Sequence, residues 1–309
     1  MDKTIKKNEI IMFFPERIRG LFENINEKIW NNITNIRITS GKPIIVETTD
    51  YRYYMNIKGD INICLSGDEF VVSQKDVSNI TELVTRSSIY AYSRYINEGF
   101  ITLPGGNRVG VAGDTVFENG KICAVNRINS LVFRLSHEKK GIADLVIDDI
   151  YSNGRISNTL IISPPGCGKT TLLRDIARNL ASHKTNPVIC ALIDERYELA
   201  CAVDDQPGLD IGQSSFAISG LPKHVAIPMV VRTMSPDVII ADEICGMKDY
   251  EVIEYALSSG CKFIATVHGK DENNNEIKCC YTDKKIFEYQ IVLGKEKGVG
   301  TINKIIRAG

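Results

Sequence analysis

The chain has 309 residues, of which 43% are hydrophobic and 24% are charged, and its formal net charge is -1. This composition is ordinary for a globular protein, and the length predicts two domains. The near-neutral charge argues against a protein that binds nucleic acid mainly by neutralising phosphates. No segment has the length and hydropathy of a transmembrane helix, so we expect a cytoplasmic protein without a direct membrane span.

The N-terminal part of the sequence predicts a small α+β domain. Helical patterns at residues 16–31 and 76–96 accompany short strand-like segments within residues 35–57. The alternation of residue types around Gly105 and Gly106 predicts a β-hairpin. A polar, glycine-bearing stretch at residues 138–141 is the expected boundary. We therefore predict an N-terminal α+β domain of residues 1–140 and a second domain of residues 141–309.

The second domain begins with a helical pattern at residues 142–153 and then carries a phosphate-binding motif. Residues 159–174 read TLIISPPGCGKTTLLR, which is an apolar strand, a tight loop and the start of an amphipathic helix. Glycines let the backbone N–H groups turn toward phosphate, Lys169 supplies a cation for the β- and γ-oxygens, and the hydroxyl of Thr170 can ligate Mg²⁺. The predicted nucleotide-binding residues are Pro164, Pro165, Gly166, Cys167, Gly168, Lys169, Thr170 and Thr171, and the predicted ligands are ATP and Mg²⁺.

One position departs from the usual motif, G-x-x-x-x-G-K-[ST], because Ser163 stands where the first glycine is expected. The two prolines that follow can fix the bend of the loop instead.

Strand and helix patterns alternate through the rest of this domain, as a parallel sheet requires. The predicted helices are residues 169–182, 224–233 and 248–259, and the predicted strands are residues 159–163, 187–194, 237–242 and 262–268. Residues 289–307 predict a closing hairpin. This alternation indicates a doubly wound α/β core that binds its ligand at the carboxyl ends of the strands.

Carboxylates and a histidine follow the predicted strands at that edge. Asp242 and Glu243 end an apolar strand, so Asp242 can hold Mg²⁺ together with Thr170, and Glu243 can orient or deprotonate a water molecule. Glu195 and His268 end two other strands and are expected near the γ-phosphate as further catalytic residues.

Three segments resemble motifs of the type II/IV secretion ATPases. RTMSPDVIIADEICG at residues 232–246 resembles their Walker B region, ATVHG at residues 265–269 their histidine box, and LIDERYEL at residues 192–199 their aspartate box. Asp242 departs from the many secretion ATPases that have glycine at this position. Within this superfamily the chain is most similar to the stage III sporulation protein AA family, a resemblance that extends to residues 35–43 and 104–113.

This resemblance implies a RecA-like P-loop NTPase core and motor-type ATPase activity. It also implies a cytoplasmic homo-hexamer that acts at the membrane through a polytopic membrane protein, on the mother cell side of a channel to the forespore. In this superfamily, arginines of the N-terminal domain reach the nucleotide, and Arg108 and Arg134 are the candidates for that catalytic role.

Two alternatives remain open from the sequence. The chain could be a P-loop ATPase that remodels nucleic acid, which the charge balance disfavours. It could also be a nucleotide-binding scaffold of a membrane complex that does not hydrolyse ATP, which the presence of Glu243 disfavours.

Overall fold

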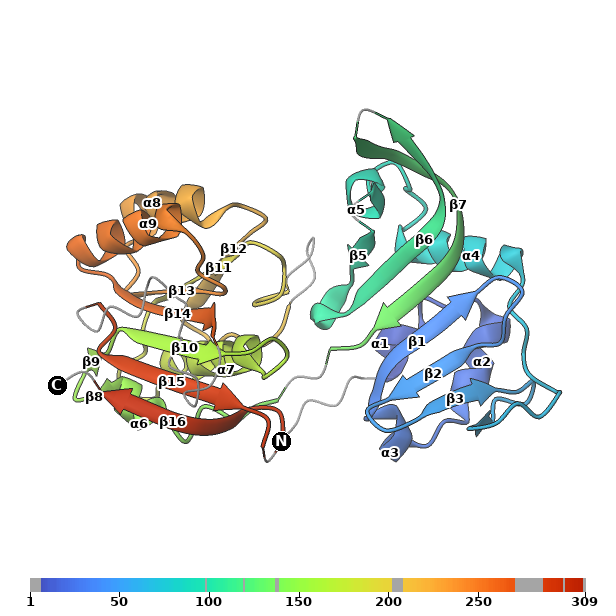
Figure 1. Cartoon of the computed structure of the whole chain (residues 1–309), viewed down its shortest axis with the longest axis horizontal. Helices are drawn as coiled ribbons and strands as arrows, with labels where there is room; N and C mark the ends of the chain where they lie inside the picture. Colours follow the sequence, from blue (N-terminus) through green and yellow to red (C-terminus); the bar gives the residue numbers. More distant parts are fainter. Residues whose placement is uncertain are drawn as a thin grey trace. The chain divides into compact units, whose positions relative to one another are not determined.

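The computed structural model describes residues 7–97, 99–118, 120–136, 139–201, 208–269, 286–296 and 298–307. The chain divides into two compact units, residues 3–138 and residues 139–309 (Figure 1). Within the described ranges, no helix is long and apolar enough to cross a membrane.

The first unit is an antiparallel sheet packed against helices, in the strand order β4-β3-β2-β1-β7-β6-β5. Its strands are β1 (Ile33–Thr39), β2 (Ile45–Thr48), β3 (Arg52–Met55), β4 (Ile61–Asn62), β5 (Phe100–Thr102), β6 (Arg108–Glu118) and β7 (Lys121–Arg134). Its helices are α1 (Lys7–Ile11), α2 (Glu16–Glu23), α3 (Glu27–Trp30), α4 (Gln74–Val84) and α5 (Ser93–Asn97). The core between them is mostly aliphatic and includes an aromatic group, in which the ring of Phe14 lies 4.9 Å from that of Phe22 and 4.8 Å from that of Phe133.

The hairpin expected around Gly105 and Gly106 is present as β5 and β6, joined by a 3-10 turn at Pro104–Gly106. The two glycines have φ angles of +72° and +79°, which favour glycine over other residues. A much longer hairpin, β6–β7, was not predicted. It is the longest strand pair of this sheet (Figure 1), and its pairing places Arg108 directly opposite Arg134.

Two predicted helices are interrupted. The pattern at residues 16–31 forms α2 and α3, with Asn26 capping the second helix through its side chain. The pattern at residues 76–96 forms α4 and α5, because Arg86 and Ser87 adopt φ angles of +50° and +61° that end the first helix.

Asp76 links α4 to α2 in the core of this unit. It is 3% exposed and completes a capping box with Ser73, and it also pairs with Arg17 at 2.5 Å. Burial acts to raise the pKa of Asp76, but the hydrogen bonds from Ser73 and Arg17 outweigh burial and lower this pKa below its ordinary value of 3.8.

We therefore expect Asp76→Ala to lower the free energy of unfolding of this unit by about 2–3 kcal/mol at pH 7. A carboxyl group whose pKa is lowered by folding stabilises the fold above its unfolded pKa, and this contribution is lost as the pH falls through the lowered value. The difference between wild type and variant should thus shrink below pH 3.8. Denaturant unfolding followed by the fluorescence of Trp30, the single tryptophan, measures this. Asp50→Ala, at an exposed turn, is the control; an equal loss in both variants would contradict the prediction.

The second unit is a mainly parallel sheet with helices on both faces, in the strand order β12-β11-β13-β14-β10-β15-β16. Its strands are β10 (Thr159–Ser163), β11 (Cys190–Asp194), β12 (Ser215–Ser219), β13 (Val238–Ala241), β14 (Lys262–His268), β15 (Tyr289–Gly294) and the antiparallel β16 (Thr301–Arg307). Its helices are α6 (Ile147–Ile150), α7 (Lys169–Ala181), α8 (Lys223–Met234) and α9 (Met247–Ser258), and β8 (Tyr151–Ser152) and β9 (Arg155–Ile156) form a small separate pair.

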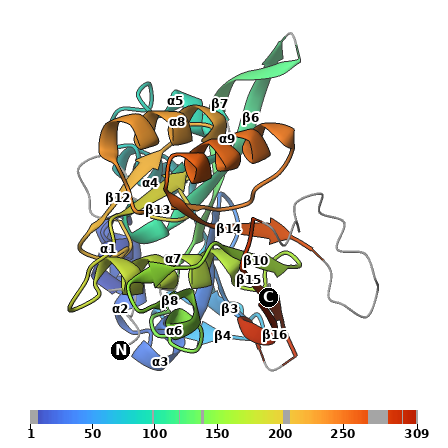
Figure 2. The same ribbon diagram turned by 90° about the vertical axis from the view of Figure 1, so that its left-hand side faces the viewer.

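Alternate residues of the buried strands face two separate cores. Ile161 of β10 belongs to the cluster beneath α7, whereas Leu160 and Ile162 belong to the cluster beneath α8 and α9. Figure 2 shows α8 and α9 on one side of the sheet and α7 on the other. The predicted strand and helix order is present, with three differences: β12 and the short β8–β9 pair were not predicted, and the helix expected at residues 142–153 is the single turn α6.

Candidate functional site

The phosphate-binding motif forms the connection between β10 and α7. Because β10 lies between β14 and β15, the loop at residues 164–168 leaves the sheet at its carboxyl edge. Gly166 and Gly168 have φ angles of +69° and +87°, a backbone conformation that side chains oppose. The two glycines of the motif therefore occupy the positions that require glycine, and Gly168 precedes the first residue of the helix.

Lys169 is buried inside this loop. It is 7% exposed, and its Nζ donates to the carbonyl oxygens of Ser163 at 3.1 Å and Pro164 at 3.2 Å. The same Nζ lies 3.0 Å from Nδ1 of His268. Burial lowers the pKa of Lys169 below its ordinary value, and the negative charge of Asp242 opposes this shift. An ammonium group held by neutral partners can exchange them for phosphate oxygens, which are stronger acceptors.

Thr170 and Asp242 meet at the start of α7. The hydroxyl of Thr170 donates to Oδ2 of Asp242 at 2.5 Å, and the hydroxyl of Thr266 donates to the other carboxylate oxygen. A hydroxyl and a carboxylate side by side fit Mg²⁺, which is usually held by one or two protein oxygens together with water and substrate phosphates. In the part of the chain that the structure describes, no group of three or more His, Cys, Asp or Glu residues could hold a metal ion. The Thr170 hydroxyl and the Asp242 carboxylate fit a cation that also takes phosphate oxygens as ligands.

Glu243 is the centre of a chain of polar contacts at the same edge. Its carboxylate accepts from Nη1 of Arg196 at 2.9 Å and lies 3.4 Å from Nε2 of His268. Its backbone N–H donates to the hydroxyl of Thr266 at 2.8 Å, and its φ angle is +51°. Such a backbone conformation costs on the order of 1 kcal/mol in a residue with a side chain and is frequent at functional sites. A continuous series of side-chain contacts therefore runs from Lys169 through His268 and Glu243 to Arg196.

Glu195 also lies at this edge, but its carboxylate is bound by Nζ of Lys223 at 2.7 Å. Lys223 is buried at the first turn of α8, so the pair joins the end of β11 to that helix. A catalytic role for Glu195 stays a prediction.

Sequence reasoning placed Asp194 among the polar residues that end a strand at this edge but gave the catalytic role to Glu195; in the structure Asp194 organises the loop that carries Glu195 and Arg196. Asp194 is 2% exposed, and its carboxylate accepts from the backbone N–H groups of Glu198, Leu199, Ala200 and Cys201. The signal that could have found it is an acidic residue that directly ends a fully apolar strand, because a buried carboxylate needs donors.

The aspartate-box loop is also tied to the helix that follows the P-loop. Arg174 of α7 donates to the carbonyl oxygens of Glu198 and Leu199, at 2.6 Å each. These bonds join α7 to the loop that carries Arg196, whose guanidinium contacts Glu243.

Arg108 and Arg134 belong to the first unit, on paired positions of β6 and β7. The guanidinium of Arg108 lies 5.0 Å from the ring centre of Phe100, and Arg134 is exposed. Their predicted contribution to the nucleotide site of the second unit stays a prediction.

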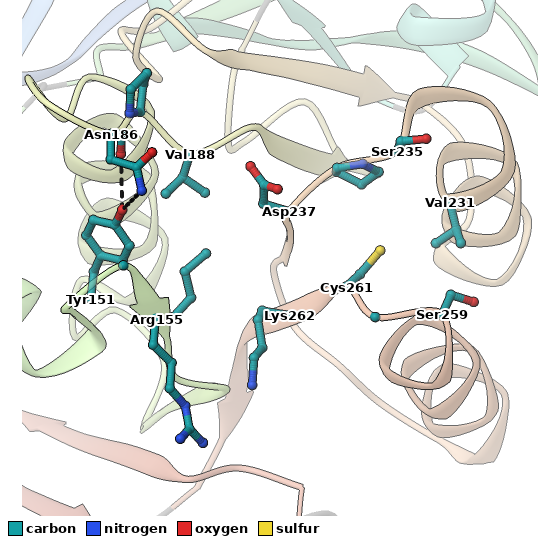
Figure 3. A pocket seen from close by; sticks show the side chains of 15 residues that line it. Tyr151, Arg155, Asn186, Val188, Val231, Ser235, Asp237, Ser259, Cys261 and Lys262 are labelled. Atoms are coloured by element: carbon teal, nitrogen blue, oxygen red, sulfur yellow. Dashed lines mark hydrogen bonds between the residues drawn. The ribbon is translucent and has the colours of Figure 1, made fainter.

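A cavity of about 600 Å³ opens at the other edge of the parallel sheet. Figure 3 shows Asp237 and Lys262, which lie at the amino ends of β13 and β14, among its lining residues. The charged groups there are paired: Asp237 accepts from the N–H of Ile189 at 2.8 Å, and Arg155 and Lys262 both contact Glu288 at 3.2 Å. Ligands of open α/β sheets bind at the carboxyl edge, so this cavity is not the candidate nucleotide site.

Comparison with known proteins agrees with this fold. The solved structure of the pilus retraction motor PilT with bound ADP has a TM-score of 0.55 at 15% identity, covering 92% of this chain and 77% of that chain. The ATPase DotB of Legionella pneumophila has a TM-score of 0.52 at 15% identity, covering 90% of this chain and 77% of that chain. These likenesses confirm the predicted α/β class, a RecA-like P-loop core with a smaller N-terminal α+β domain.

The sequence comparisons identify the family. The family model described as "Sporulation stage III, protein AA" matches residues 4–308. Stage III sporulation protein AA of Bacillus subtilis (strain 168) is 32% identical over 303 residues, which cover 96% of this chain and 94% of that protein. The predicted resemblance is thereby confirmed, and the chain belongs to the stage III sporulation protein AA family.

Proposed function

We propose that this chain is an ATP-hydrolysing motor of the secretion type. The observation that supports this function most strongly is the convergence of Lys169, Thr170, Asp242, Glu243 and His268 at one edge of the sheet. These groups come from β10, β13, β14 and the start of α7, and together they are the set that phosphoryl transfer needs: a cation, a site for Mg²⁺ and a base.

Each residue has a separate role in this proposal. The N–H groups of the loop at residues 164–168 and the ammonium of Lys169 bind the β- and γ-phosphates, while Thr170 and Asp242 hold the metal ion. Magnesium, when bound, neutralises charge on the phosphate oxygens. Glu243 accepts a proton from the attacking water, so its carboxylate must be available at the γ-phosphate. His268 contacts both Lys169 and Glu243. When a bound γ-phosphate takes the place of His268 at the ammonium of Lys169, the imidazole of His268 can shift and change its contact with the base, Glu243.

The family and the likeness to secretion ATPases support the remaining parts of the proposal. The chain acts as a cytoplasmic homo-hexamer, attached to the membrane on the mother cell side through a polytopic membrane protein of a channel to the forespore. Adjacent subunits share each nucleotide, and hydrolysis moves the small domain against the core. Arg108 and Arg134 supply positive charge to the γ-phosphate in the assembled ring.

We expect Arg108→Ala to leave the affinity for ATP nearly unchanged and to lower turnover in the assembled protein by at least about tenfold, because charge supplied at the γ-phosphate acts mainly in the transition state. Steady-state phosphate release and equilibrium ATP binding measure the two effects. Arg52→Ala, at an exposed position of the same sheet, is the control. Unchanged turnover of Arg108→Ala would remove this residue from the site.

Phosphate release by the wild-type chain tests the proposed function. It is measured with Mg·ATP for the purified chain, for the chain with membranes that contain its partner, and for the chain with nucleic acid. The proposal expects release that membranes increase and nucleic acid leaves unchanged. Stimulation by nucleic acid alone would favour the remodelling ATPase, and binding of ATP without release in every mixture would favour the scaffold.

A further inference from the structure

The turn between β15 and β16 lies beside the P-loop, although about 130 residues separate the two segments in the sequence. β15 pairs with β10 in parallel from Thr159↔Tyr289 to Ile162↔Val292, so both strands end at the carboxyl edge of the sheet. The P-loop follows one of these strands and the turn follows the other. The adjacency is thus fixed by strand pairing within the core.

Two distances from the glycines of the phosphate-binding loop show how close the turn comes to that loop. A Cβ atom built on Gly166 would lie 3.4 Å from Nζ of Lys295, and one built on Gly168 would lie 3.3 Å from Cγ1 of Val299. Both glycines of the phosphate-binding loop therefore face this turn. Val299 is nevertheless 60% exposed, so most of its apolar surface remains accessible.

Hydrogen bonds join described residues of this segment to one another. The N–H of Gly298 donates to the carbonyl of Lys295 at 3.0 Å, and the hydroxyl of Thr301 donates to the carbonyl of Gly298 at 2.7 Å. Among the described residues, Nζ of Lys295 makes no hydrogen bond or ion pair, so this ammonium is available for a ligand.

The position of the hydrolytic groups sets the direction of a bound nucleotide. In the strand order β13-β14-β10-β15, Asp242, Glu243 and His268 lie on the β14 side of the P-loop strand, and the turn lies on the β15 side. If the γ-phosphate lies at the first side, the α-phosphate, ribose and base extend toward the second. There they meet a cation beside Gly166 and an exposed apolar side chain beside Gly168.

We infer that Lys295 and Val299 form the nucleoside side of the site, with Lys295 contacting the α-phosphate and ribose and Val299 packing against the base. This inference rests on the proposed nucleotide-binding function. It assigns residues that bind a nucleoside di- or triphosphate and take no part in hydrolysis. Substitution of these residues should therefore change the affinities for ATP and for ADP by the same factor.

Calorimetric titration of the full chain with Mg·ADP and with Mg·tripolyphosphate tests the inference. Lys295→Ala should weaken ADP binding about tenfold, the loss of one charge-assisted contact, and Lys295→Arg should keep the affinity within about threefold of wild type. Val299→Ser should weaken ADP binding about fivefold and leave tripolyphosphate binding unchanged, because only the nucleoside contacts the valine. Lys184→Ala and Ile305→Ser, at exposed positions of the same unit, are the matched controls.

The outcomes separate this inference from the function on which it rests. If the wild-type chain binds ADP and the Lys295 and Val299 variants bind it equally well, the turn is not part of the site. If the wild-type chain binds neither ADP nor tripolyphosphate, the proposed function itself fails. Tripolyphosphate binding by Val299→Ser also verifies that the variant has an intact P-loop.

Discussion

Substitution of Glu243 by glutamine is expected to lower the rate of phosphate release at least about a hundredfold and to leave the affinity for Mg·ATP within about twofold. The amide has nearly the shape of the carboxylate, so the contact with Arg196 can persist through its oxygen. It cannot accept a proton from the attacking water. The phosphate-binding loop is not touched by this change, and binding and hydrolysis should therefore separate.

Glu254→Gln is the matched control, because Glu254 is an exposed glutamate of α9 in the same unit. The measurement is phosphate release under single-turnover conditions, with ATP binding determined by titration. If Glu243→Gln hydrolysed ATP as fast as wild type and Glu254→Gln, Glu243 would not be the base. A loss of ATP binding in Glu243→Gln would also contradict the proposed separation of roles.

Substitution of Lys169 by methionine is expected to have the largest effect on binding, a loss of at least about a hundredfold in affinity for both Mg·ATP and Mg·ADP. Lys169 is the cation inside the loop, and its ammonium replaces carbonyl partners with phosphate oxygens when a nucleotide binds. The same change should not destabilise the free protein. Burial lowers the pKa of Lys169, which means that the folded chain disfavours the charged ammonium when no phosphate is present.

Two measurements on the same sample test this prediction: titration with ADP and thermal unfolding without nucleotide. Wild type should be stabilised by added Mg·ADP, whereas Lys169→Met should melt at the wild-type temperature and show no shift with ADP. Lys184→Ala, which removes an exposed lysine just beyond the carboxyl end of α7, should behave as wild type. A variant that binds ADP normally, or one that unfolds before nucleotide is added, would contradict the assigned role.

The sequence predicts the P-loop strand and helix almost to the residue, because their signals are local. β10 is the predicted segment, and α7 begins at Lys169 as expected. Periodicity, glycine and the Gly-Lys-Thr sequence all act within a few residues, so no tertiary contact is needed to locate them.

The parts that sequence reasoning missed depend on long-range contacts. The β6–β7 hairpin is built from strands with irregular alternation and several register shifts, which weakens the period-2 signal. Asp194 acts through backbone N–H groups, and any residue type can supply these. Lys295 reaches the P-loop only because β15 pairs beside β10, a pairing that no local pattern reveals.

A crystal structure of the chain with Mg²⁺ and a non-hydrolysable ATP analogue tests the central claim most directly. We expect the β- and γ-phosphates within hydrogen-bonding distance of Lys169, with the metal ion held at Thr170 and Asp242 and a water molecule between Glu243 and the γ-phosphorus. A nucleotide bound at any other place, or a metal ion distant from both Thr170 and Asp242, would contradict the proposed site.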